Sequence, residues 1–106
     1  MYKLIFAPEF VNDLEETNEY IASTLESPDA AKSIMKEIDD TIMKLKDMPF
    51  MFPKCDEPLD VFEYRKIIIK NYILIYYVDE SQNIVNLLRC FYGKSNYLDF
   101  FNGTGR

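Results

Sequence analysis

The sequence has no histidine, the residue that most often serves as a general base or a metal ligand near neutral pH. Catalysis of the Ser-His-Asp or Cys-His kind and metal sites built on imidazole are therefore excluded. Only two cysteines are present, Cys55 and Cys90, and they lack the Cys-x-x-Cys spacing of a zinc site. We expect both to be reduced thiols in a cytoplasmic protein that carries no metal and no cofactor.

Long apolar runs are missing as well. No segment reaches the roughly 18 to 20 residues needed to cross a bilayer, and the N-terminus lacks the pattern of a secretion signal. We therefore expect no membrane partner. With 106 residues, of which 48% are hydrophobic and 28% charged, the chain has the composition of a globular domain. We expect one domain over residues 1–106, with a flexible tail at 102–106.

Basic side chains are few, and the net charge is -6, which taken alone argues against binding to nucleic acid. The acidic side chains are unevenly distributed along the chain. Residues 1–60 carry 6 basic and 14 acidic side chains, whereas residues 61–106 carry 6 basic and 4 acidic ones. Because fields are screened beyond roughly 8 Å at physiological salt, a basic face on the C-terminal part is compatible with an acidic remainder.

The pattern of residues 2–46 predicts a strand followed by two helices. Period-two alternation predicts a strand at residues 2–6, and helical spacing predicts a helix at residues 8–25 with an acidic outer face. Ser27-Pro28-Asp29 is typical of a helix start, and Pro49 prevents a helix from continuing beyond about residue 46. The apolar positions of the two helices are Phe10, Val11, Leu14, Ile21, Ala22 and Leu25, then Ala31, Ile34, Met35, Ile38, Ile42 and Leu45.

Residues 48–58 contain three prolines and no sustained period, which predicts a loop that Phe50, Met51 and Phe52 attach to the core. After it, residues 61–69, 72–78 and 84–91 are rich in Ile, Val, Tyr and Leu, and short polar segments separate them. These runs predict an antiparallel meander with residues 72–78 as its central strand. The fold class is therefore α+β, with a helix hairpin packed on one sheet that the N-terminal strand extends.

Several local motifs occur in an order that resembles the RelE/ParE toxin superfamily over essentially the whole chain. They are Glu19-Tyr20-Ile21 with Ser27-Pro28-Asp29-Ala30-Ala31, Leu45-x-x-x-Pro49, Tyr64-Arg65-Lys66-Ile67 with Asn71-Tyr72-x-x-x-Tyr76, and Leu88-Arg89-x-x-Tyr92-Gly93-Lys94-x-x-Tyr97. The resemblance implies the toxin of a bacterial type II toxin–antitoxin system, which arrests growth. It also implies a cognate antitoxin as partner, whose amphipathic segment covers the sheet or the hairpin groove.

The resemblance leaves two targets open. ParE-like members inhibit DNA gyrase, whereas RelE-like members are ribosome-dependent mRNA endonucleases that work without metal. The helix-hairpin motifs and the acidic balance favour DNA gyrase, and the ribosome with mRNA is the alternative. An inactive toxin-fold binding module is a further alternative.

If the chain cuts RNA, cations must stabilise the charged phosphorane and another group must move a proton. The candidates are Arg65, Arg89 and Lys94, helped by Lys66, for the charge, and Tyr92 or Tyr97 as general acid or stacking platform. Each has a structural alternative: arginines paired to an acid of the first helix, a solvated lysine, and tyrosines that close the core. Ile73 also departs from the RelE-like pattern, in which an arginine often stands at its place.

Overall fold

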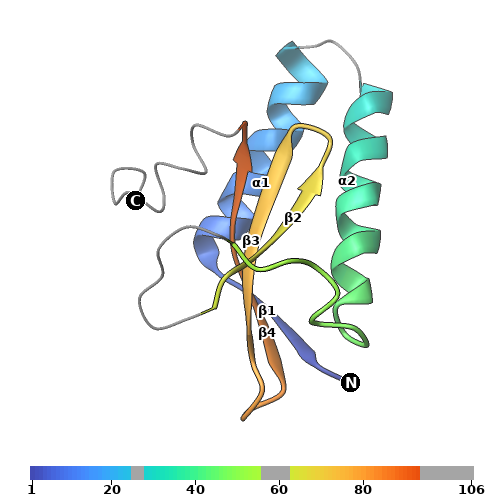
Figure 1. Ribbon diagram of the computed structural model, residues 1–106. Helices are drawn as coiled ribbons and strands as arrows, with labels where there is room; N and C mark the ends of the chain where they lie inside the picture. Colours follow the sequence, from blue (N-terminus) through green and yellow to red (C-terminus); the bar gives the residue numbers. More distant parts are fainter. Residues whose placement is uncertain (25–27, 56–62, 94–106) are drawn as a thin grey trace.

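The computed structural model describes residues 1–24, 28–55 and 63–93. The elements follow in the order β1 (Lys3–Phe6), α1 (Pro8–Glu19), the π-helical turn η1 (Tyr20–Thr24), α2 (Pro28–Lys44), β2 (Arg65–Ile69), β3 (Tyr72–Asp79) and β4 (Ile84–Tyr92). Both helices lie on the same side of a single sheet (Figure 1). The α+β class, the helix hairpin and the three-stranded meander predicted from the sequence are confirmed.

The four strands form a mixed sheet in the order β1-β4-β3-β2. The meander β2-β3-β4 is antiparallel, and β1 joins β4 in parallel, with Lys3 opposite Ile84 and Phe6 opposite Leu87. The first and last strands of the described chain are therefore neighbours. The turn between β2 and β3 has only two residues, and Lys70 adopts a positive φ of 53° there, as tight hairpins require.

The helices begin where the sequence predicted, because Pro8 and Pro28 take first-turn positions that need no amide donor. The end of the first helix differs from the prediction, since α1 passes into η1 at Tyr20. Within η1, the Ser23 hydroxyl donates to the Glu19 carbonyl at 2.5 Å, a bond that competes with regular helical pairing.

The main core lies between the helices and the sheet. It contains Phe10 of α1, Ile21 of η1, three residues of α2, Leu45 directly after α2, and the inward residues of β2, β3 and β4. Tyr76, at the centre of this core, is fully buried, and its hydroxyl donates to the Pro49 carbonyl at 2.8 Å. That bond attaches the loop after α2 to the middle of the sheet.

Three apolar residues predicted to be buried are not. Val11 is 43% exposed because it lies away from the stripe that Phe10 and Ile21 form on the helix. Phe50 and Met51 are also exposed, and of the three loop residues expected to contact the core, only Phe52 packs against it. Leu25 and Ser27 lie outside the described residues.

Candidate functional site

The face of the sheet opposite the helices, here called the open face, is the first candidate surface. Its apolar cluster consists of buried Cys55, Ile75 and Phe91 with partly buried Tyr64, Ile73 and Leu88. Lys66 lies beside this cluster because it is paired with Ile75 in the sheet register, and Ile68, two residues further along β2, is 65% exposed. The described part of this face is therefore mostly apolar.

A β-bulge in β4 decides which residues reach the open face. Tyr76 is paired with Leu87 while Ile75 is paired with Arg89, so Leu88 is an extra residue in the strand. Val85 and Leu87 consequently face the helices, whereas Arg89 shares the open face with Ile75. Strict alternation would have placed Arg89 beside Leu87 in the main core.

The guanidinium of Arg89 bonds a carboxylate of α1. Its Nε donates to Asp13 Oδ2 at 2.8 Å and a terminal nitrogen donates to Oδ1 at 3.2 Å, and the group also lies 4.8 Å from the centre of the Phe91 ring. The hydrogen bond to Asp13 raises the pKa of Arg89, although partial burial opposes this. Arg89 therefore matches the structural alternative of an arginine paired to an acid of the first helix.

Asp13 also completes the hydrogen bonding of β4. Its Oδ2 accepts the backbone N–H of Cys90 at 2.9 Å, at a point of the strand that β1 does not reach. The carboxylate thus takes the place of a missing neighbouring strand. In the sequence, Asp13 is only one of several acids on the outer face predicted for this helix, because nothing local marks its distant partners.

Arg65 lies at the start of β2, on the helix side of the sheet, since it is paired with Tyr76. It donates to the carbonyls of Phe52 at 2.7 Å and Phe50 at 3.5 Å, and its guanidinium is 5.0 Å from the centre of the Phe50 ring. The structure thus ties Arg65 to the loop after α2 and brings it no acid of the first helix. Arg65 and Arg89 are consequently on opposite faces of the sheet.

Tyr92 belongs to a group of three tyrosines on the helix side. Its ring centre lies 5.2 Å from that of Tyr72 and 6.2 Å from that of Tyr20, and the side chain is 53% exposed. Burial raises the pKa of Tyr72, and the nearby Tyr92, Cys90 and Tyr20 raise it further. Tyr92 thus packs toward the helix hairpin and does not share the open face with Arg89.

Gly93 has a φ of 83°, a backbone conformation that glycine adopts without steric cost. Burial raises the pKa of the Cys90 thiol to about 12, so this cysteine is unreactive at neutral pH. Among the residues described, no group of three or more His, Cys, Asp and Glu side chains is arranged to hold a metal ion. No described helix is long and apolar enough to span a membrane.

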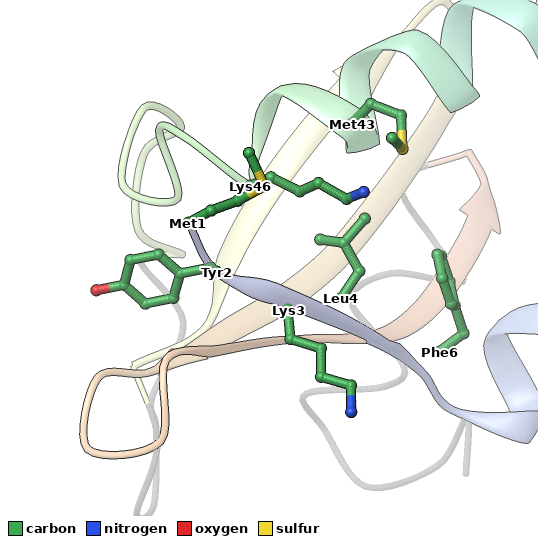
Figure 2. A pocket seen from close by; sticks show the side chains of 7 residues that line it. All are labelled: Met1, Tyr2, Lys3, Leu4, Phe6, Met43 and Lys46. Atoms are coloured by element: carbon green, nitrogen blue, oxygen red, sulfur yellow. The ribbon is translucent and has the colours of Figure 1, made fainter.

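A groove of about 460 Å³ lies along the outer side of β1 (Figure 2). Leu4 and Phe6 form its β1 side, and Met43 and Lys46 come from the end of α2 and the turn that follows. The Lys46 ammonium group reaches toward Met43, whereas the Lys3 side chain points to the other side of the strand. The groove is thus apolar, with a lysine on each side of β1.

A family model described as ParE toxin of type II toxin-antitoxin system, parDE, matches residues 4–97. The chain belongs to this toxin family. It is therefore a type II toxin of a toxin–antitoxin system, as the motifs indicated. No curated protein sequence matches it.

Solved structures agree with the family at the level of the fold. A chain of the chromosomal ParDE system of Pseudomonas aeruginosa has a TM-score of 0.70 at 16% identity, over 89% of this chain and 98% of that one. The isolated Escherichia coli RelE toxin gives 0.60 at 13% identity, over 97% and 98%. A chain of the RelBE2 complex of Mycobacterium tuberculosis gives 0.58 at 15% identity, over 86% and 96%.

Within this toxin-family fold, the candidate residues do not form one constellation. Arg89 is on the open face and bound to Asp13, Arg65 is on the helix side near the loop, and Tyr92 packs with Tyr72. Lys94 and Tyr97 lie outside the described residues. The bulge at Leu88 was not predicted, and Asp13 was not identified as the acid of the first helix that binds Arg89, because both depend on pairing between distant segments.

Proposed function

We propose that this toxin acts on a protein target in the ParE-like manner, with DNA gyrase as that target, and that it does not cut RNA. The observation that carries the proposal is that the chain's own groups already bind the guanidinium groups of Arg65 and Arg89. Arg65 donates to two loop carbonyls, and Arg89 is paired with a carboxylate that is only 11% exposed. A phosphate would have to displace these partners before either arginine could stabilise it.

The open face supports the same proposal. An RNA-cutting surface needs several cations around one phosphate, together with a group that moves a proton. In the described part of this face, the apolar cluster around Ile75 and Phe91 occupies the centre, and Ile73 stands where RelE-like members often have an arginine. An apolar surface with exposed Ile68 at its margin is better suited to contact with a protein.

We also infer that the partner which silences the toxin is a cognate antitoxin. The P. aeruginosa structure is that of a ParDE toxin–antitoxin system, and the M. tuberculosis structure is that of a toxin–antitoxin complex. The chain shares their fold and belongs to a family defined by such pairs. The location of toxin and antitoxin in the bacterial cytoplasm is part of this proposal.

Two assays on purified protein test the choice of target. We expect the protein to inhibit supercoiling of relaxed plasmid by gyrase, and to leave a defined mRNA intact during cell-free translation followed by primer extension. Tyr92→Phe is expected to change neither result, and Tyr20→Phe serves as a matched control in the same aromatic group.

Ribosome-dependent cuts that Tyr92→Phe abolishes, at an unchanged unfolding midpoint, would overturn the proposal and establish the RelE-like alternative. Normal growth on induction, with neither gyrase nor mRNA affected, would instead indicate the inactive binding module. Growth arrest with inhibited supercoiling is the result that the proposal requires.

A further inference from the structure

Three tyrosines from different elements meet at one end of the sheet and are called the tyrosine cluster. Tyr20 begins η1, Tyr72 begins β3 and Tyr92 ends β4. The sheet register pairs Tyr72 with Tyr92, whose ring centres lie 5.2 Å apart, and the ring centres of Tyr20 and Tyr92 lie 6.2 Å apart. The end of the first helical segment, the tip of β4 and the β2–β3 turn thus lie at the same end of the molecule (Figure 1).

The tyrosine cluster has a buried base and two exposed rings. Tyr72 is 4% exposed, whereas Tyr20 is 46% and Tyr92 is 53% exposed. The next residue along the helix, Ile21, is 1% exposed and attaches this segment to the main core, so the core does not depend on burial of the Tyr20 ring. Exposed tyrosine rings that neighbouring rings hold in place are typical of protein contact sites, because they offer a large contact area at a low cost in conformational entropy.

The helical segment that carries Tyr20 is acidic. Residues 8–24 contain no lysine or arginine, and their charged residues are Glu9, Asp13, Glu15, Glu16 and Glu19. Glu16 is one turn before Tyr20, so the two side chains lie on the same face of the helix. The hydrogen bond from Asp13 is the main cause of the raised pKa of Arg89, and the charge of Glu16 adds to it. Glu16 therefore lies on the side of the helix that faces β4.

The negative charge of this face is only partly neutralised within the described residues. The guanidinium of Arg89 is bound to Asp13. Glu16 accepts a hydrogen bond from the neutral side-chain amide of Asn12 at 3.1 Å, and no ion pair among the described residues includes Glu16. The helix dipole adds to the negative potential, because neither α1 nor η1 has a basic residue in its last turn. A cation is therefore favoured between Glu16 and Tyr20.

The combination of aromatic rings with a carboxylate selects a planar cation. A guanidinium group can stack on an aromatic ring and donate to a carboxylate at the same time, whereas an ammonium group is a compact and strongly hydrated charge. The chain itself contains this geometry, since the guanidinium of Arg89 binds Asp13 and lies 4.8 Å from the centre of the Phe91 ring. Glu16 and Tyr20 offer the same two kinds of partner to a guanidinium from another molecule.

We propose that Glu16 and the tyrosine cluster form a docking site for an arginine side chain in a basic segment of a partner protein. The guanidinium stacks on the exposed ring of Tyr20, next to Tyr92, and pairs with the carboxylate of Glu16. Tyr72 supports the rings from the core side. The site is separate from the choice of target, because neither gyrase inhibition nor RNA cleavage by itself requires it.

Peptides that differ in a single group test the site on the full chain. The probe is the acetylated and amidated peptide Gly-Ser-Arg-Ser-Gly, titrated at low salt into the ¹⁵N-labelled protein. We expect saturable chemical-shift changes at the amides of Glu16 and Tyr20 and at the rings of Tyr20 and Tyr92. The same peptide with citrulline in place of arginine keeps the shape without the charge and is expected to bind about tenfold more weakly. The peptide with lysine is expected to bind about threefold more weakly than the arginine peptide.

Substitutions in the protein make the test specific. Glu16→Gln is expected to weaken binding of the arginine peptide about fivefold, because it removes the charge and keeps the shape of the side chain. Glu15→Gln, on a different face of the same helix, is the matched control and is expected to leave binding unchanged. Tyr20→Leu is expected to weaken binding, whereas Tyr20→Phe keeps the ring and is expected to retain it. The unfolding midpoint of each variant shows that a loss of binding does not come from a loss of folding.

Three results would overturn the proposal. They are equal binding of the arginine and citrulline peptides, an equal effect of the two glutamate variants, and shift changes confined to other parts of the protein. Equal binding of the lysine peptide would overturn the assignment of the site to a guanidinium. Because none of these measurements uses gyrase or mRNA, failure here leaves the proposed target standing, and failure of those assays leaves the docking site standing.

Discussion

Replacing Asp13 with alanine tests the contact between α1 and β4 most directly. Asp13 is 11% exposed and Arg89 is 22% exposed, and the carboxylate accepts two bonds from the guanidinium and one from the Cys90 amide. Removing one member of a largely buried pair costs about 3 to 5 kcal/mol when the other charge stays buried. Because Arg89 is partly exposed, we expect a smaller loss, about 2 to 3 kcal/mol in the free energy of unfolding.

Urea denaturation followed by circular dichroism measures this loss. With a slope of about 1.5 kcal/mol per molar urea, the midpoint of Asp13→Ala is expected to fall by roughly 1.3 to 2 M. The control is Asp40→Ala, which removes an ion pair with Lys36 whose side chains are 57% and 76% exposed. That variant is expected to lose no more than about 0.5 kcal/mol. If both variants fall by the same small amount, Asp13 does not support β4.

Two further predictions concern residues of the main core, Tyr76 and Cys90. Tyr76→Phe removes the donor to the buried Pro49 carbonyl and is expected to lower the free energy of unfolding by about 1 to 2 kcal/mol, measured by the same urea titration. The thiol of Cys90 has its pKa raised from 9.0 to about 12 in the folded chain, so folding favours the protonated form. That stabilisation is complete below pH 9 and declines as the pH rises toward 12, and the decline is expected to be shallower in Cys90→Ala. An equally steep decline in the variant would contradict the assignment to this thiol.

The sequence predicted the elements well because their signals are local. The prolines at 8 and 28 set helix starts, and the continuous apolar run of residues 72–78 marked the central strand. The π-helical turn was missed because it depends on a competing bond between Ser23 and Glu19 and not on apolar spacing. Val11 was wrongly assigned to the buried stripe of the first helix, because one apolar residue beside that stripe does not change the helical period of the sequence.

The candidate site was less predictable because side-chain partners come from distant segments. Arg89 lies in a predicted strand, but the side of the sheet that its side chain faces depends on the extra residue Leu88 in β4. Pairing of Arg89 with an acid of the first helix was one of the predicted alternatives, but local sequence does not distinguish Asp13, 76 residues away, from the other acids of that helix. Arg65 likewise has its acceptors in the loop after α2, where backbone carbonyls leave no mark in the sequence.

The parallel pairing of β1 with β4 also bears on how the chain folds while it is being synthesised. The partner of Lys3 is Ile84, so the first strand leaves the ribosome about 80 residues before the segment that must lie beside it. Both helices are also complete before any strand of the meander exists to cover their apolar stripes. Long-range closure of this kind slows folding, because loop entropy is lost before the contacts form. A nascent chain that stops before β4 therefore has no completed core.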